Sequence, residues 1–293
     1  MIRFSKNFPL YKYPFGFLKQ LSGYYQYFDH PVIDTKNPMM GSFLGINGKQ
    51  SFLSSLRDKH KGQRCFIIAN GPSLNDLNID YLKDEITLGC NGIFNRFHEW
   101  GFHTDYYFIE DNVQTELRAK EVSKLKGPIK FVGLHNNYCF PFFNDLNYFH
   151  VPIRGNMAYT SSDDLYPQFS LDVAAITYFG GTITYIMLQF AYHLGFDEVY
   201  IVGLDHDYGK LPEIFPPGKI KVTKENYEMV QQCHYDKNYY QIGDTLGVPH
   251  VEAQNSAYEK ANKIFNQSGR KVFNASSNTK LEVFEKVKYE NLF

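Results

Sequence analysis

CFIIANGPS, at residues 65–73, is the stretch that decides the fold predicted from this sequence. The apolar run 65–69 has the length of a β-strand that is covered on both faces. Gly71 allows a tight turn, Pro72 suits the first position of a helix, and Ser73 can cap exposed backbone amides. Because a strand leading into a helix N-terminus gathers N–H groups at the positive end of the helix dipole, we expect an anion-binding turn here.

Similar strand-like segments follow along the chain and alternate with helical ones. Short apolar runs predict strands at 86–90, 106–109, 130–134, 148–153, 198–202 and 271–274. Helices are predicted at 51–60, 182–194 and 252–268. Strands that alternate with helices predict an α/β fold with a mostly parallel sheet and helices on both faces.

Two regions stand outside this alternation. Residues 1–60 are an N-terminal arm rich in aromatic and basic residues, followed by a helix, and residues 61–293 form the α/β domain. Within that domain no regular pattern persists from 209 to 251. Because so long an irregular stretch in a compact domain usually serves a function, we predict a lid at about 206–250.

The composition excludes several classes of protein. Lys and Arg number 30 against 31 Asp and Glu, so no global field attracts nucleic acid. The four cysteines are far apart, which disfavours a zinc site or a disulfide framework and fits a reducing compartment. We find no signal peptide and no apolar run near the ~20 residues that span a bilayer. We therefore expect a cytoplasmic protein.

The arm leaves two interpretations open. Aromatic residues alternate with basic ones at 3–28, a pattern that suits peripheral contact with the inner face of the membrane. Packing on the domain or on a second subunit is the commoner fate of aromatic residues. The aromatic-rich segment 137–149 is a further candidate surface for a homo-oligomer.

Polar residues and glycines gather where the predicted strands end, which is where open α/β sheets bind ligands. These positions are Asn70, Gly71, Ser73, Asn91, Gly92, Glu110, Asp111, Asn112, Asp205, His206, Asp207 and Tyr208. Asn-Gly alone is common in turns, but the recurrence across several strand ends predicts a nucleotide cleft. The motifs GxGxxG and GxxxxGKS/T are absent, which disfavours a dinucleotide oxidoreductase and a P-loop NTPase.

Two segments carry candidate chemistry. Asp205 and Asp207 face the same way on an extended chain, which leaves a metal site or an ordinary turn open. In the predicted lid, CHYDKNYY at 233–240 combines His234 with three tyrosines. These side chains can supply a general base and neutral donors to phosphate oxygens. His206 is the second candidate base.

Taken in order, these motifs resemble the MptE-like (DUF115) family, Rossmann-type proteins often encoded with surface-polysaccharide genes. The resemblance spans about four fifths of the chain. The matching stretches are HKGQRCFIIANGPSL, GCNGIF, YYFIEDN, GGTITYIMLQFAYHLGF, EVYIVGLD, HYDKNYY and NASSNTKLEVFEKV. The chain is also similar, more distantly, to the bacterial sialyltransferases of glycosyltransferase family 42.

The distant resemblance implies roles for individual residues. Tyr208, Tyr235 and Tyr239 would donate hydroxyls to a departing phosphate, and His234 would deprotonate an acceptor hydroxyl. The nucleotide-binding set that follows from it and from the strand ends is Asn70, Gly71, Ser73, Asn91, Gly92, Asp111, Gly181, Thr182, Thr184 and Asp205.

Two positions depart from the related patterns. The base of family 42 lies four residues after the His-Tyr pair, where this chain has Asn238, and Asp236 replaces the second His of an HxHPDY pattern. Family 42 enzymes need no metal, so no cofactor is expected. The acidic strand ends nevertheless leave a Mg²⁺-dependent variant open.

The resemblance implies a sialyltransferase-like glycosyltransferase of bacterial surface-polysaccharide synthesis. Its donor would be a CMP-activated keto-sugar acid such as sialic acid, and its acceptor a glycan or lipid-linked glycan. Two alternatives stay open. One is a Mg²⁺-dependent pyrophosphokinase that uses ATP, with carboxylates such as Asp111 and Asp205 on the ion. The other is a non-catalytic nucleotide-binding module, which the departure at Asn238 favours.

Overall fold

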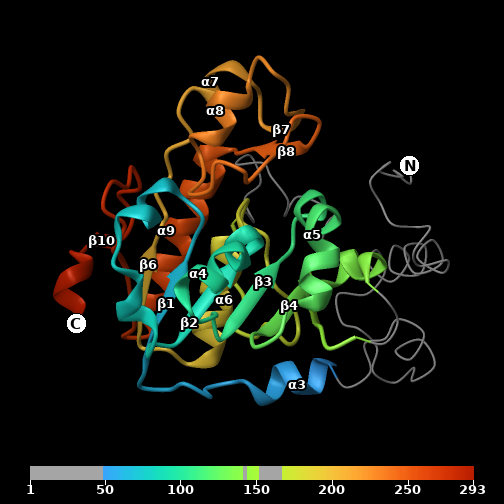
Figure 1. Cartoon of the computed structure of the whole chain (residues 1–293). Coiled ribbons are helices and arrows are strands. Elements are labelled where there is room, and N and C mark those ends of the chain that lie inside the picture. Colours follow the sequence, from blue (N-terminus) through green and yellow to red (C-terminus); the bar gives the residue numbers. More distant parts are fainter. Residues whose placement is uncertain (1–48, 141–143, 152–166) are drawn as a thin grey trace.

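The apolar run of the opening motif forms strand β1 (Arg64–Ile68), which lies inside an eight-stranded parallel sheet (Figure 1). The computed structural model describes residues 49–140, 144–151 and 167–293. The sheet has the order β10-β9-β6-β1-β2-β3-β4-β5. Its other strands are β2 (Thr87–Cys90), β3 (Tyr106–Ile109), β4 (Ile129–Gly133), β5 (Asn147–Phe149), β6 (Glu198–Val202), β9 (Lys271–Asn274) and β10 (Glu285–Lys286). The predicted α/β fold with a mostly parallel sheet is confirmed.

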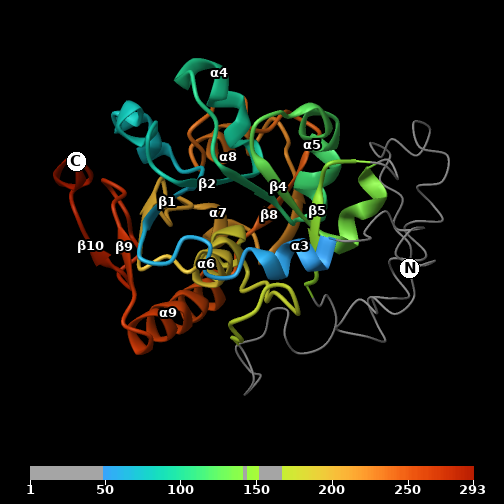
Figure 2. The same ribbon diagram turned by 90° about the horizontal axis from the view of Figure 1, so that it is seen from below.

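Helices cover both faces of this sheet, as predicted (Figure 2). One face carries α3 (Lys49–Ser55), α6 (Ile183–Leu194) and α9 (Val251–Gln267). The opposite face carries α4 (Phe97–Trp100) and α5 (Asn112–Lys124). Figure 2 shows the two layers of helices with the sheet between them.

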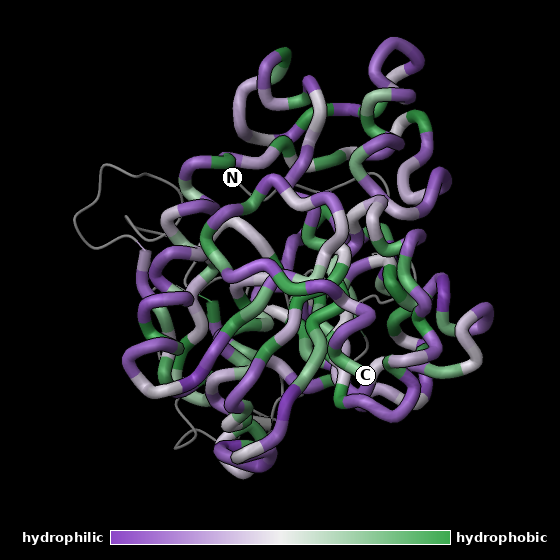
Figure 3. Tube along the Cα trace, turned by 90° about the vertical axis from the view of Figure 1, so that its left-hand side faces the viewer, coloured by the Kyte–Doolittle hydropathy of each residue, from purple (hydrophilic) through white to green (hydrophobic). Residues whose placement is uncertain are grey.

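Strand β1 shows why the sheet is buried on both sides. Cys65 and Ile67 belong to the core beneath α6 and α9, whereas Phe66 and Ile68 belong to the core on the α5 side. Successive side chains of a strand point to opposite faces, and helices cover both faces, so all four side chains are fully buried. In Figure 3 the hydrophobic positions accordingly concentrate inside the molecule, and the outer turns are largely hydrophilic.

The predicted lid contains more regular structure than its sequence indicates. It holds α7 (Leu211–Ile214), α8 (Tyr227–Gln231) and an antiparallel pair of strands, β7 (Gly218–Lys221) and β8 (Thr245–Val248). Each of these elements has four or five residues, so a periodic pattern has no length in which to show itself. The segment projects from one edge of the sheet (Figure 1).

The turn after β1 also differs from its prediction. Residues Pro72–Asp76 form a five-residue 3-10 helix, η1, rather than the start of an α-helix. The remaining 3-10 turns are η2 (Ile79–Leu82), η3 (Asn91–Arg96), η4 (Leu134–Cys139) and η5 (Tyr289–Leu292).

The predicted arm lies outside the described residues, apart from α3 and the turns that follow it. In that part, Leu53 and Leu56 are buried in the same core as β1. The aromatic segment 137–149 is described only in part, because 141–143 lie outside the described residues. None of the described helices has the length and apolarity needed to cross a membrane.

Candidate functional site

The order in which strands are added to the sheet changes side at β1. The chain runs from β1 through β2, β3 and β4 to β5 on one side, and then adds β6, β9 and β10 on the other. Such a reversal opens a crevice at the carboxyl ends of the two strands that flank it, which are β1 and β6 here. The turns after these strands, at 70–73 and 203–206, therefore define the centre of the candidate site.

These two turns bind each other directly. The amide of Ser73 donates to Oδ2 of Asp205 at 2.8 Å, and the Ser73 hydroxyl donates to Oδ1 of the same carboxylate. The amide of Gly71 donates to the carbonyl of Gly203 at 2.8 Å. The anion-binding amides expected after β1 are thus partly occupied by a carboxylate of the protein itself. Burial raises the pKa of Asp205, and the two hydrogen bonds from Ser73 oppose this rise.

Gly71 is required for a different reason from the one expected. Its φ is −76°, which any residue can adopt. A Cβ at Gly71 would lie 2.6 Å from Oδ2 of Asp205 and 2.6 Å from the carbonyl oxygen of Gly203. The glycine therefore permits the close approach of the two turns, not a left-handed backbone.

The lid closes over the turn after β2. The Tyr235 hydroxyl donates to the carbonyl of Gly92 at 2.7 Å, and the Gly92 amide donates to the Tyr239 hydroxyl at 3.2 Å. The Tyr235 amide donates to the carbonyl of Asn70 at 2.9 Å. Asn91 adopts a left-handed φ of 50°, a conformation uncommon outside glycine. The structure thus brings together Asn70, Asn91, Gly92 and the lid tyrosines, as the sequence predicts.

His234 lies among the lid tyrosines. Its ring stacks on Tyr239 at a centroid distance of 4.1 Å and meets Tyr240 edge-on at 5.3 Å. Burial and, to a smaller extent, the charge of Arg118 lower the pKa of His234 to about 4. The imidazole is therefore neutral at pH 7 and able to accept a proton.

Arg118 is the residue of this cluster that sequence reasoning missed. It extends from α5, its guanidinium lies 4.5 Å from the centre of the Tyr239 ring, and Nη2 donates to the carbonyl of Tyr239 at 3.1 Å. A signal was present in the sequence, since Thr115, Ala119 and Val122 occupy the same buried face of that helix. A charged residue within a core-facing stripe is unusual enough to mark a site.

Tyr208 and the start of α6 form a second group on the other side of the crevice. The Tyr208 hydroxyl donates to Oε1 of Gln254 at 2.9 Å, and Nε2 of Gln254 donates to the carbonyl of Gly181. Thr182 caps α6 by accepting the Thr184 amide at 3.3 Å. Burial raises the pKa of Tyr208, so its hydroxyl keeps the proton that it donates.

The acidic strand ends do not converge on one point. Asp207 pairs with Lys280 at 2.9 Å, and Asp111 caps α5 by accepting the Gln114 amide at 2.9 Å. Asp205 and Asp111 follow β6 and β3, which are three strand spacings apart, or about 14 Å. Within the described ranges, no group of three or more His, Cys, Asp or Glu side chains is arranged to hold a metal ion.

The ring of His206 contacts the rings of Tyr208 and of Tyr258 on α9. Its Nε2 lies 2.8 Å from Oδ1 of Asn255 on α9, and its φ is 51°. Burial lowers the pKa of His206, whereas the contact with Asn255 raises it. The two candidate bases of the sequence analysis, His206 and His234, therefore have different surroundings.

A buried pair of titratable groups lies further along the same edge of the sheet. Nε2 of His135 is 3.3 Å from Oε1 of Glu110. Burial raises the pKa of Glu110 well above its usual range and lowers the pKa of His135 to about 4. Burial thus disfavours the charged form of each group. The sequence indicated Glu110 as a strand end but gave no sign of its partner.

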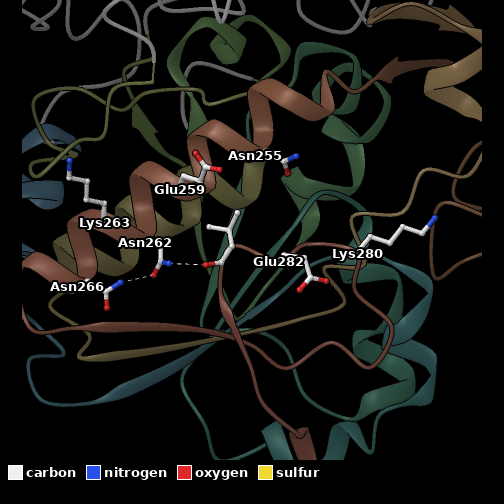
Figure 4. A pocket seen from close by; sticks show the side chains of 8 residues that line it. Asn255, Glu259, Asn262, Lys263, Asn266, Lys280 and Glu282 are labelled. Atoms are coloured by element: carbon white, nitrogen blue, oxygen red, sulfur yellow. Dashed lines mark hydrogen bonds between the residues drawn. The ribbon is translucent and has the colours of Figure 1, made fainter.

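A polar groove of about 520 Å³ runs between α9 and the segment 280–283 (Figure 4). Nδ2 of Asn262 donates to the carbonyl of Val283 at 2.8 Å, which ties that segment to the helix. The charges of the lining balance, because it contains two lysines and two glutamates. The lining residues are Asn255, Glu259, Asn262, Lys263, Asn266, Lys280, Glu282 and Val283. Asn255 connects the groove to His206.

Comparison with known proteins identifies relatives of this chain. Residues 45–210, more than half of the chain, match the family model described as 6-hydroxymethylpterin diphosphokinase MptE-like. Comparison with curated proteins finds no match. Among solved structures, the fold is similar to the MAf glycosyltransferase from Magnetospirillum magneticum AMB-1, with 15% sequence identity and a TM-score of 0.47. The superposition covers 87% of this chain and 40% of that one, so the chain spans less than half of that protein's length.

Proposed function

We propose a nucleotide-dependent transfer reaction for this chain, which belongs to the MptE-like family of proteins similar to 6-hydroxymethylpterin diphosphokinase. The observation that carries the proposal is the docking of the lid. Tyr235 and Tyr239 bind the turns after β1 and β2, although about 150 residues separate them from these turns. Hydroxyl and imidazole groups are thereby held at the sheet edge where α/β proteins bind nucleotides.

The donor we propose is a CMP-activated keto-sugar acid, such as CMP-sialic acid, and the acceptor a hydroxyl of a glycan or lipid-linked glycan. In the reaction, the acceptor oxygen forms a new bond to the anomeric carbon while the bond from that carbon to the phosphate oxygen breaks. The acceptor proton passes to His234, and CMP leaves. Tyrosine hydroxyls near the departing phosphate stabilise its growing charge as neutral donors.

The surroundings of the site support this assignment of roles. His234 is neutral at pH 7, so it is in the protonation state that a general base requires. Tyr235 and Tyr239 have pKa values raised by burial, so their hydroxyls keep the protons with which they donate. For the base or sugar of the nucleotide we propose Thr182, the N-cap of α6, together with Thr184.

The first test is binding. Thermal shift measurements with CMP, UDP, GDP and ATP, each with and without Mg²⁺, should show stabilisation by CMP. At a ligand concentration of 100 times Kd, a cognate ligand stabilises a protein by about 2.7 kcal/mol. Isothermal titration calorimetry then gives Kd. The proposal is abandoned if no nucleotide binds.

The second test concerns the base. His234→Ala should abolish turnover of the CMP-sugar while CMP still binds with its original affinity, because the imidazole contacts the acceptor rather than the nucleotide. In the wild-type protein, kcat/KM should stay level on acidification until the pH approaches about 4, the pKa of His234. An acid limb nearer the usual histidine value would assign the base to His206 instead. Retained turnover in the variant would also exclude His234.

The family supplies a second candidate, a diphosphate transfer from ATP to a hydroxymethyl group. The observation in its favour is the match to the diphosphokinase-like family model. A Mg²⁺ ion in this reaction would be bound at Asp111 or at Asp205 and not between them, since about 14 Å separates their strands. Loss of activity in EDTA and a preference for ATP over CMP would favour this candidate. Binding of nucleotide without any turnover would identify a non-catalytic module.

A further inference from the structure

Arg118 is a buried cation that has no acidic partner among the residues that the structure describes. Only 6% of the residue is exposed. Its Nη2 donates to a backbone carbonyl, that of Tyr239, and its Nη1 is buried with no hydrogen-bond partner among the described residues. The ion pairs found in the described part of the chain do not include it. A guanidinium keeps its charge at every accessible pH, so burial without a counter-ion is costly.

The groups around Arg118 are those that bind an oxyanion. The guanidinium lies 4.5 Å from the ring centre of Tyr239 and 6.0 Å from that of Tyr240. A Cβ at Gly92 would lie 3.3 Å from its Nε, so the backbone after β2 passes directly beside it. The Gly92 amide donates to the Tyr239 hydroxyl, a group that an oxyanion can replace as acceptor. Gln114 has a buried Oε1 without a partner in the described ranges, although its Nε2 donates to the Tyr240 hydroxyl.

We propose that Arg118 and the Gly92 amide form the binding site for the phosphate group of the ligand. The lid segment 233–240 holds Arg118 when no phosphate is bound. To bind, the phosphate replaces the Tyr239 carbonyl at Nη2 and gains Nη1 as a second donor, in the paired geometry that guanidinium groups offer to phosphate oxygens. The lid tyrosines must move for this exchange, which couples lid position to phosphate binding.

This inference rests on the proposed function and deepens it. The phosphate of a CMP-sugar is a diester with one negative charge. When the bond to the anomeric carbon breaks, it becomes a monoester and gains negative charge. A fixed cation at this point stabilises the transition state more than the bound donor, which is how a charged group accelerates such a step.

The test compares ligands that differ only in phosphate. Isothermal titration calorimetry with CMP and with cytidine is carried out on the wild-type protein and on Arg118→Met, which keeps much of the side-chain volume. We expect the variant to bind cytidine with unchanged affinity and CMP roughly tenfold to hundredfold more weakly. The wild-type affinity for CMP should fall with added salt more steeply than that of the variant. Arg118→Lys should recover part of the loss.

Arg96→Met is the matched control. Arg96 also lies over a lid tyrosine, with its guanidinium 5.1 Å from the Tyr235 ring centre, but it pairs with Glu99. Its substitution should leave the difference between CMP and cytidine intact. Equal weakening of both ligands in Arg118→Met, or unchanged CMP binding, would overturn the inference and leave the proposed function standing.

Inorganic pyrophosphate is a second probe, and it tests the anion site separately from the proposed function. It is applied to the wild-type protein, so the result does not depend on whether a variant folds. Inorganic pyrophosphate should raise the thermal midpoint of the wild-type protein above that in chloride of equal ionic strength. If Arg118→Met does not fold, the increase should be smaller in Arg118→Lys than in the wild-type protein. Stabilisation by pyrophosphate without binding of any nucleotide would support the anion site and reject the nucleotide function. Absence of stabilisation by both pyrophosphate and CMP would overturn the site.

Discussion

At the scale of single residues, Asp205 shows how a predicted site changes on folding. Ser73 and Asp205 were both predicted to face a ligand, and they face each other instead. A ligand phosphate near Ser73 would meet the carboxylate of Asp205. The positive charge of the site lies one strand further along the sheet, where Arg118 packs beside Gly92.

Gly71→Ala tests the close approach of these two turns. The added Cβ would lie 2.6 Å from a backbone oxygen, so the turns must move apart. We expect a loss of about 1–3 kcal/mol in the free energy of unfolding, measured by urea denaturation. Gly247→Ala is the control, because a Cβ there meets nothing within 4 Å. Equal stability of the two variants would show that the two turns can move apart without loss of stability.

At the scale of elements, the lid is held by a few specific contacts. Its strands β7 and β8 pair only with each other, in a two-stranded sheet separate from the central one. The segment between α8 and β8 carries Tyr235, Tyr239 and Tyr240, all of them buried against the central domain. Docking therefore depends on side chains rather than on a shared sheet, and such a segment can open without unfolding the core.

Tyr235→Phe should loosen this docking. The substitution removes the hydroxyl that donates to the buried carbonyl of Gly92 at 2.7 Å, at a cost of about 1–2 kcal/mol. Amide hydrogen exchange within 227–248 should accelerate, while exchange in β1 and β6 stays slow.

Tyr227→Phe provides the comparison for the lid. Tyr227 lies on α8, and no hydrogen bond of its hydroxyl is found among the described residues. Amide hydrogen exchange within 227–248 should be as slow in Tyr227→Phe as in the wild-type protein. Acceleration throughout the sheet in Tyr235→Phe would mean that the lid and the core unfold as one unit.

At the scale of the whole molecule, buried histidines link stability to pH. Burial lowers the pKa of His135, His150 and His234 to about 4 in the folded protein, against about 6.5 for a histidine in an unfolded chain. The unfolded chain therefore binds more protons between pH 6.5 and 4, and stability is lost as the pH falls through this range. Each histidine contributes a slope of about 1.4 kcal/mol per pH unit. Glu110 acts in the opposite sense, since its raised pKa favours the folded state at low pH.

Urea denaturation at pH 7.5, 6.5, 5.5 and 4.5 measures this slope. We expect a progressive loss of stability below pH 6.5, and a smaller slope in His234→Gln. His98→Gln, which alters an exposed histidine on α4, serves as the control. A stability that is independent of pH between 6.5 and 4.5 would show that the buried histidines are protonated without cost.

Local sequence patterns predicted the layered architecture and the strand-end turns that form the candidate site. Apolar runs of strand length and the helical periodicity between them are local patterns, and they predicted the parallel sheet and most of its strands. The turns after β1 and β2 were equally visible, because an Asn-Gly dipeptide follows each of these strands. The MptE-like resemblance drew on the same stretches, and the family match over 45–210 confirms it.

Which of these residues meet depends on the tertiary structure. The order of the strands places Asp205 beside Ser73, whereas Asp111 follows a strand three positions away, and no local pattern encodes that order. Arg118, Gly92 and Tyr239 come together from three distant segments, through contacts that exist only once the lid has docked. Composition and spacing reflect local preferences, that is, which residues near one another in the sequence are buried and which strand or helix they form. Pairings across the crevice depend on packing between elements, which a single sequence does not display.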